Sequence, residues 1–199
     1  DFGTDDFTIS LWTNAIYISQ SSSYNTLITN GEANSSGDGF ALNLQDNGAL
    51  WFKAGGSSYI STPTGLYPND GTWAHIAAVK NGGELLLYVN GEYVYASNVA
   101  NVSVDNNAPI MIGGDYDSSE NPQGSRSITG SIADVKIFND NFGESEIARL
   151  AAYINVPGES SGEPEKLVSW WKLTNGSVKD SSYDNDSISC ANTCFNHIL

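Results

Sequence analysis

The chain has 199 residues and a formal net charge of −15, and only 16% of its residues are charged. Such an acidic surface repels nucleic acid phosphates and anionic membranes, so we expect no nucleic acid partner. No apolar run approaches the roughly eighteen residues of a membrane-spanning helix, so we expect no membrane insertion. The length is that of one sizeable domain. The first residue is Asp and no signal-peptide pattern follows it, so we expect a processed piece of a longer chain.

Short strands joined by polar turns are predicted along the first half of the chain. In residues 6–12 (DFTISLW), apolar residues alternate with polar ones, which is the pattern of a half-buried strand. Asn47-Gly48 and Asn90-Gly91 each separate two apolar runs, and such pairs indicate hairpins closed by type I′ turns. Further strands are expected at 73–79 and 108–114.

The strand pattern breaks within residues 127–138. Apolar residues keep one parity up to Ile132 and then change parity at Val135 and Ile137, which is what a β-bulge produces. We therefore predict a bulge near Ala133-Asp134. The Asp134 carboxylate is then either solvent-facing, as on an ordinary strand, or turned outward onto a structural ion.

One helix is predicted, late in the chain, at residues 143–153. Its apolar residues Ile147, Leu150 and Ala151 fall on one face, and two glutamates lie in the first turn, where the helix dipole favours them. The Pro/Gly/Ser-rich stretch near 155–166 is typical of a flexible linker before a closing strand.

About a dozen short strands and one late helix favour an all-β fold, an antiparallel β-sandwich. We expect a single domain over residues 1–199. Trp12, Trp73 and Trp170 are interpreted as core residues.

The two cysteines, Cys190 and Cys194, lie four residues apart near the C-terminus. One interpretation is a disulfide across a turn, which implies an oxidising compartment. Zinc is the weaker alternative, because His75 and His197 are the only histidines.

A resemblance to a known family rests on four stretches of the sequence. They are DFTISLW, GTWAHIAAVKNGGELLLYVNGEYV, the pair IMIGGDYDSS and SITGSIADVKIFN, and FGESEIARL. These stretches resemble the laminin G-like and pentraxin-like group of the concanavalin A-like lectin superfamily, and KLVSWWKLTNGSV resembles the closing strand of pentraxins. The resemblance implies a jelly roll of concanavalin A-like type, a fold that many functions share.

The loop after Gly114 is acidic, with Asp115, Asp117 and Glu120 within six residues. This loop is either simply solvated or it holds a cation. The resemblance to pentraxins implies calcium at this place, and Asp115, Asp117 and the Tyr116 carbonyl offer oxygen ligands at the family's spacing.

The same alignment departs from the pentraxin pattern at two positions. Tyr24 stands where the family carries an acid, and Arg126 lies near the place of a glutamine ligand. We therefore expect one calcium ion, and Asn25 closes its coordination shell.

Aromatic residues near this loop indicate a sugar-binding surface, because flat rings stack on sugars while polar groups orient the hydroxyls. Tyr24 and Tyr116 lie beside the expected ion in the alignment. Trp51 and Tyr59 on the neighbouring hairpin are further candidates, and Glu120 is a polar one.

The sequence offers little support for a catalytic site. No strand carries the paired acids of a glycosidase, and His75 has no Ser or Cys signature beside it. We expect no enzyme activity, and predict a calcium-assisted, lectin-like module of a larger extracellular protein that binds a polysaccharide or glycan. A protein-binding adhesion domain with a protein receptor is the alternative, and a glycan-degrading enzyme is the less favoured one.

Overall fold

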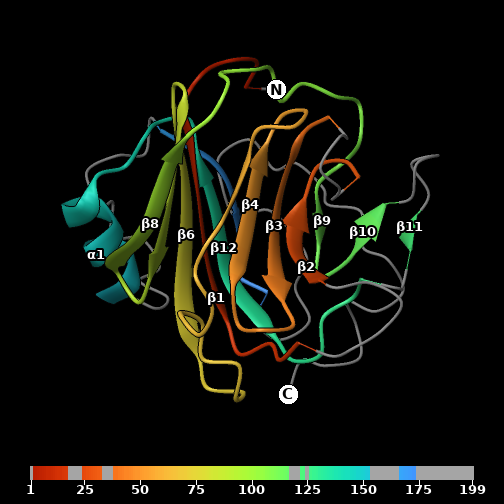
Figure 1. Ribbon diagram of the computed structural model, residues 1–199, viewed down its shortest axis with the longest axis vertical. Helices are drawn as coiled ribbons and strands as arrows, with labels where there is room; N and C mark the ends of the chain where they lie inside the picture. Colours follow the sequence, from red (N-terminus) through yellow and green to blue (C-terminus); the bar gives the residue numbers. More distant parts are fainter. Residues whose placement is uncertain are drawn as a thin grey trace.

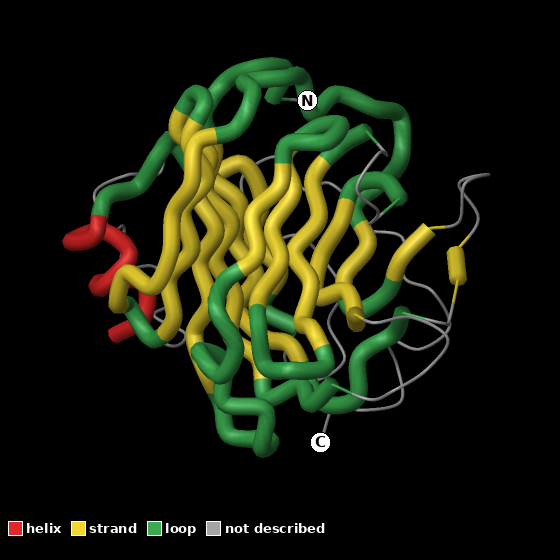
Figure 2. Tube along the Cα trace, in the orientation of Figure 1, coloured by secondary structure: helices red, strands yellow, loops and turns green. Residues whose placement is uncertain are grey.

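The computed structural model describes residues 2–17, 24–32, 38–116, 122–123, 126–152 and 166–173. Over these residues the chain forms two large antiparallel sheets that pack face to face, and one helix lies beside them (Figures 1 and 2). The expected jelly-roll β-sandwich with one late helix is therefore confirmed. The cysteines and nearly all of the expected linker lie outside the described residues, so the disulfide, the linker and the single domain over 1–199 stay predictions.

The six-stranded sheet has the order β13-β12-β1-β6-β7-β8. Its strands are β1 (Phe7–Thr13), β6 (Ala74–Asn81), β7 (Glu84–Val89), β8 (Glu92–Asn98), β12 (Ile132–Phe138) and β13 (Leu167–Trp171). The late strand β13 pairs antiparallel with β12, so residues 167–171 lie at one edge of this sheet.

The five-stranded sheet has the order β5-β4-β3-β2-β9, and a two-stranded sheet pairs β10 with β11. The strands are β2 (Tyr24–Thr29), β3 (Phe40–Gln45), β4 (Leu50–Ala54), β5 (Tyr59–Ser61), β9 (Met111–Ile112), β10 (Asp115–Tyr116) and β11 (Pro122–Gln123). In Figure 1 the two-stranded sheet lies beyond the β9 side of the five-stranded sheet.

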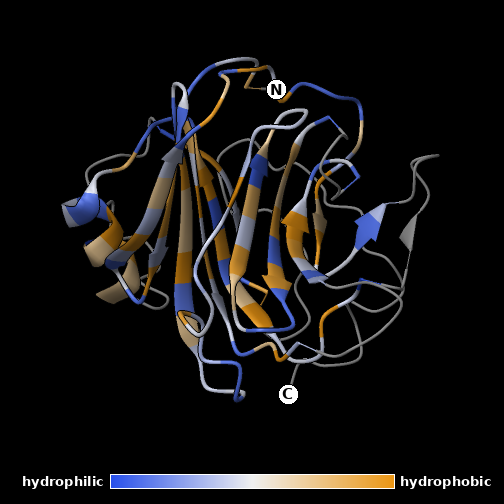
Figure 3. Cartoon of the chain, viewed as in Figure 1, coloured by the Kyte–Doolittle hydropathy of each residue, from blue (hydrophilic) through white to orange (hydrophobic). Residues whose placement is uncertain are grey.

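The core lies between the two large sheets. Phe7 of the six-stranded sheet packs against Phe40 and Phe52 of the five-stranded sheet, with ring centroids 5.5 and 6.3 Å apart. All three side chains are buried, and each contributes roughly 1.5–3 kcal/mol by leaving water. Figure 3 shows apolar and polar colours mixed along the paired strands, as expected where side chains alternate between two faces.

The strand β1 is more buried than the sequence indicated. It lies between β12 and β6, and the polar side chains Thr8 and Ser10 are buried as fully as the apolar ones. The expectation of a half-buried strand is therefore wrong, because β1 is central in its sheet and the outer face is covered as well.

The expectation that Trp12, Trp73 and Trp170 are core residues is also wrong. Trp73 is 47% exposed, and Trp12 and Trp170 are partly exposed, whereas Trp171 is 1% exposed. Trp171 pairs with Val135, which faces the core, so its neighbour Trp170 must face outward.

The two Asn-Gly hairpins are both present, but their turns differ. At Asn90-Gly91 both residues have positive φ, 53° and 83°, which confirms the type I′ turn. At Asn47-Gly48 only Gly48 has positive φ, 74°, so the type I′ expectation is wrong there. The Gly48 N–H donates to the Gln45 carbonyl, which gives the longer loop that ends in a left-handed glycine.

The predicted β-bulge is confirmed at β12. Two residues, Asp134 and Val135, lie opposite Leu11 of β1, and Asp134 has φ 51°. Asp134 is buried, so the solvent-facing expectation is wrong. Its carboxylate accepts hydrogen bonds from Lys136 Nζ and from Trp170 Nε1, both at 2.7 Å, so a lysine ammonium supplies the counter-charge.

The predicted helix is confirmed as α1 (Glu144–Ala152), which packs on the outer face of the six-stranded sheet beside β6 and β8 (Figure 1). The Gly143 N–H donates to the Glu146 carboxylate at 2.9 Å, which caps the first turn. Ile147 joins the apolar cluster beneath the helix. Within the described residues no helix has the length and apolar character needed to cross a membrane.

His75 lies fully buried on β6, on the outer face of the six-stranded sheet. Its Nε2 atom lies 2.8 Å from the Ser10 hydroxyl, a neighbour that the sequence did not reveal, and its ring lies beside Trp12. Its Nδ1 atom has no hydrogen-bond partner among the described residues. Burial, reinforced by Lys136, lowers the pKa of His75 to about 3, so the imidazole is neutral and structural at neutral pH.

We expect His75 to make the fold sensitive to acid. As the pH falls below 6.5, the unfolded chain takes up a proton that folded His75 refuses until about pH 3. The free energy of unfolding of the wild type, relative to that of His75→Gln, should therefore fall by up to about 1.4 kcal/mol per pH unit across this window. Urea unfolding at a series of pH values measures this, and a constant difference would contradict it.

Candidate functional site

Three aromatic side chains form a row across the outer face of the five-stranded sheet. This aromatic row consists of Tyr24 on β2, Trp51 on β4 and Tyr59 on β5. The Trp51 ring centroid lies 5.9 Å from that of Tyr24, with the rings within 14° of parallel, and 5.3 Å from that of Tyr59. The sequence named all three residues, and the structure brings them together.

Strand alternation explains why the row faces outward. On β4, Leu50 and Phe52 belong to the core, so Trp51 between them points to the opposite face. The strand β3 lies between β4 and β2, and its Ala41 belongs to the same small apolar cluster as Trp51 and Tyr24. The rings of Trp51 and Tyr24 meet across this intervening strand.

The rings of the row differ in their access to solvent. Tyr59, at the sheet edge, is 44% exposed, whereas Trp51 is 7% exposed because it lies between the other two rings. Tyr24 is half-buried. The row therefore offers an open ring at the edge and a rigid, packed support behind it.

Arg126 lies over the far end of the aromatic row. Its guanidinium carbon is 4.6 Å from the centre of the Tyr24 ring, in cation–π contact, and its Nη1 donates to Asp115 Oδ2 at 2.5 Å. Its carbonyl accepts a hydrogen bond from Thr26 N–H, which holds this segment against β2. Burial raises the pKa of the Tyr24 hydroxyl, and the Arg126 charge opposes that rise.

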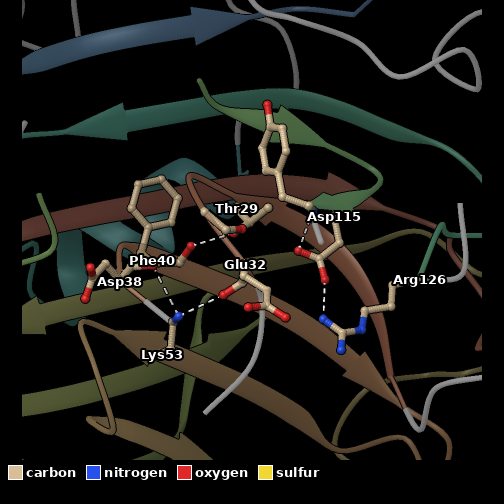
Figure 4. A network of polar contacts seen from close by, with 9 residues as sticks. Thr29, Glu32, Asp38, Phe40, Lys53, Asp115 and Arg126 are labelled. Carbon is tan, nitrogen blue, oxygen red and sulfur yellow. Dashed lines mark hydrogen bonds and ion pairs between the residues drawn. The ribbon is translucent and has the colours of Figure 1, made fainter. Parts of the chain in front are cut away.

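Lys53 is a second cation on the same face, and it is fully buried. It follows Trp51 by two residues on β4, so strand alternation places it on the outer side. Its ammonium donates to the carbonyl oxygens of Glu32 at 2.9 Å and Asp38 at 3.3 Å (Figure 4). Burial lowers the pKa of Lys53 to about 8, while the carboxylates of Asp115, Asp38 and Glu32 oppose this shift.

Two neutral polar side chains continue the register of Trp51 across β3 and β2. Asn43 on β3 pairs in register with Trp51 and with Thr26 on β2. Both side chains are fully buried, and neither the Asn43 amide nor the Thr26 hydroxyl has a hydrogen-bond partner among the described residues. Buried polar groups normally find partners, so the hydroxyl of a ligand would satisfy these two groups if the side chains that cover them moved aside.

The other predicted site residues do not all join this face. The Tyr116 ring is 2% exposed, so the expectation that it stacks on a sugar is wrong: the ring is packed inside the fold. Asn25 is fully buried and pairs with the core residue Leu44. Directly paired residues face the same side, so Asn25 points away from Tyr24 and does not close a shell on the outer face.

The described residues fit the expected calcium poorly. Both oxygens of Asp115 are engaged, Oδ2 by Arg126 and Oδ1 by the Tyr116 N–H at 2.7 Å. Within the described part of the chain no three His, Cys, Asp or Glu residues form a group that could hold a metal. Asp117 and Glu120 lie outside the described residues, so calcium at this loop stays a prediction.

Sequence reasoning missed the two cations as parts of the site. Lys53 follows Trp51 by two residues on one strand, so the sequence alone could have placed both side chains on the same face. Arg126 was noticed only as a departure from a ligand pattern. Its contact with Tyr24 and Asp115 joins segments far apart in sequence, which no local pattern reveals.

The sequence matches a family model described as the concanavalin A-like lectin/glucanases superfamily over residues 1–148. The chain therefore belongs to this superfamily. No match was found among curated proteins.

Solved structures share the fold at low sequence identity. A candidate carbohydrate-binding protein from Bacteroides ovatus is 20% identical, with a TM-score of 0.64, over 93% of this chain and 52% of that one. The chain thus spans about half the length of that protein. A heptameric SAP-like pentraxin from Limulus polyphemus is 15% identical, with a TM-score of 0.58, over 76% of this chain and 71% of that one.

A third similar structure is the CBM40 domain of the IT-sialidase from Ruminococcus gnavus, bound to α2,3-sialyllactose. It is 14% identical, with a TM-score of 0.57, over 75% of this chain and 84% of that one. At such identities these likenesses show the shared fold.

We expect the Arg126–Asp115 pair to stabilise the fold. Arg126→Gln leaves a buried carboxylate without its counter-charge and should lower the free energy of unfolding by about 3 kcal/mol. The double variant Asp115→Asn/Arg126→Gln should lose less than half of that. Urea unfolding measures both values.

The half-exposed pair of Lys166 and Asp140 is the control. Asp140→Asn/Lys166→Gln should cost less than about 1 kcal/mol. Equal losses at the two pairs would contradict the importance of burial at Asp115.

Lys53 predicts an unusual response to alkali. Between pH 8 and 10.5 the unfolded chain keeps a proton on Lys53 that the folded chain has released. The free energy of unfolding of the wild type, relative to that of Lys53→Met, should therefore rise by up to about 1.4 kcal/mol per pH unit in this window. Parallel curves for the two proteins would show that the ammonium is not buried as described.

Proposed function

We propose that the chain is a non-catalytic carbohydrate-binding module of a larger extracellular protein. The observation that carries this proposal is the aromatic row on the outer face of the five-stranded sheet. Two solved relatives, the Bacteroides ovatus protein and the sialyllactose-bound CBM40 domain, are described as binding carbohydrate and share the fold, which supports it.

Tyr59 is the stacking surface in this proposal. Its exposed ring receives the apolar face of a sugar ring, and the stacked rings of Trp51 and Tyr24 hold the position of Tyr59. Such preorganisation reduces the entropy that is lost on binding.

Polar groups beside the row orient the sugar hydroxyls. Ser61 on β5 and Gln45 on β3 bond to each other at 2.9 Å, and the amide of Asn43 lies two residues before Gln45 on the same strand. A few fixed amide and hydroxyl groups around an aromatic surface are the usual composition of a sugar site.

The absence of catalysis is part of the proposal. Hydrolysis of a glycosidic bond needs two carboxyl groups that face one cleft. On this face the Asp115 carboxylate is engaged by Arg126, and Glu144 and Glu146 lie on α1 beside the other sheet. The buried Ser10–His75 pair lies on that other sheet as well.

Binding to immobilised polysaccharides tests the proposal, with Tyr59→Ala as the site variant and Tyr93→Ala as its control. Tyr93 is 49% exposed on β8 of the other sheet, so the two variants remove similar rings from opposite sides. Tyr59→Ala should weaken binding about tenfold, the equivalent of about 1.4 kcal/mol, and Tyr93→Ala should not. Thermal denaturation should show both variants folded.

Two results would contradict the proposal. Wild-type protein that binds no polysaccharide would favour the protein-binding adhesion domain. Equal losses in the two tyrosine variants would place the sugar away from the aromatic row.

A further inference from the structure

Among the described residues, five charged side chains of the candidate site lie together. Arg126 and Lys53 are positive, and they lie among the carboxylates of Asp115, Glu32 and Asp38 (Figure 4). Two positive and three negative groups leave about one negative charge on a chain whose formal net charge is −15.

Arg126 already acts as the cation for Asp115. Asp115 is fully buried, and a buried carboxylate requires a counter-charge or hydrogen bonds to stay ionised. The guanidinium supplies both at 2.5 Å, and its other side is fixed by the Tyr24 ring. The cation predicted beside Asp115 is thus present as a side chain.

Lys53 has the same role on β4. Its ammonium contacts two backbone carbonyl oxygens and lies within electrostatic reach of three carboxylates. Carbonyl and carboxylate oxygens are the ligands that calcium takes in proteins. Here an ammonium ion of the chain itself holds Glu32 and Asp38 to β4.

Resting on the proposed function, we propose that these two side-chain cations replace calcium on this face and that the site binds a neutral saccharide without a metal. An acidic saccharide would meet a face with excess negative charge and cations that are already neutralised. A neutral saccharide needs only stacking and hydrogen bonds to hydroxyls.

The neutral polar groups of the face fit such a ligand. The Asn43 amide offers donors and an acceptor, and the Thr26 hydroxyl offers one of each. Both are fully buried without a partner among the described residues, next to the aromatic row. A sugar hydroxyl would pair with such groups, without bringing a charge into the site, once the side chains that cover them moved aside.

Thermal denaturation tests the calcium half of the inference. The melting temperature of the wild type should be the same in millimolar calcium chloride and in EDTA. Arg126→Lys, which keeps the charge, should melt closer to the wild type than Arg126→Gln does. A melting temperature that rises with calcium in the wild type would overturn the inference, because binding to the native state must stabilise it.

Matched glycans test the ligand half. Immobilised lactose and 3′-sialyllactose form one pair, and galactan and polygalacturonate form another; the first member of each pair is neutral and the second carries carboxylates. We expect binding to neutral members that persists in EDTA and changes less than twofold between low and physiological salt. Binding that is confined to acidic members, or lost in EDTA, would overturn the inference and leave the proposed function intact. If the wild type bound none of these glycans and none of the immobilised polysaccharides, both the inference and the proposed function would be overturned.

Discussion

The alternation of side chains along strands that are packed face to face is the constraint on which the site depends. Phe52 and Leu50 are held between the sheets, so Trp51 and Lys53 must point to the outer face. A slip of one residue would exchange these sets and place an indole and an ammonium in the core. The core packing that stabilises the sandwich therefore also fixes the position of the aromatic row.

Buried charge imposes the second constraint. The chain has few basic residues, yet Arg126 and Lys53 both lie at the site near the buried acid Asp115. The other sheet repeats this arrangement, because Asp134 at the bulge is bonded to Lys136 and Trp170. An ionised group leaves water only with a partner, and both buried acids of the described residues, Asp115 and Asp134, are matched by a cation of the chain. The ionic groups at the site thus bond to one another and to the backbone.

Local signals in the sequence were sufficient for much of the fold. The hairpin at Asn90-Gly91, the bulge at Asp134 and the helix α1 each depend on residues close together in sequence, and all three are confirmed. Interpretations that depended on whether a side chain is buried or exposed in the folded chain failed. Trp73 is exposed and Tyr116 is buried. Neither outcome follows from the neighbouring residues in the sequence.

The sequence by itself determined the superfamily, the alternating strands and the identity of the three aromatic residues of the row. Which face each residue occupies was decided by strand pairing: Trp170 and Trp171 are adjacent and chemically identical, yet pairing of Trp171 with Val135 sends one inward and the other outward. The contacts of Arg126 with Tyr24 and Asp115 likewise exist only in the folded chain. Such contacts join distant segments, and only the packing of the sheets brings the atoms within the few ångströms over which hydrogen bonds and ion pairs act.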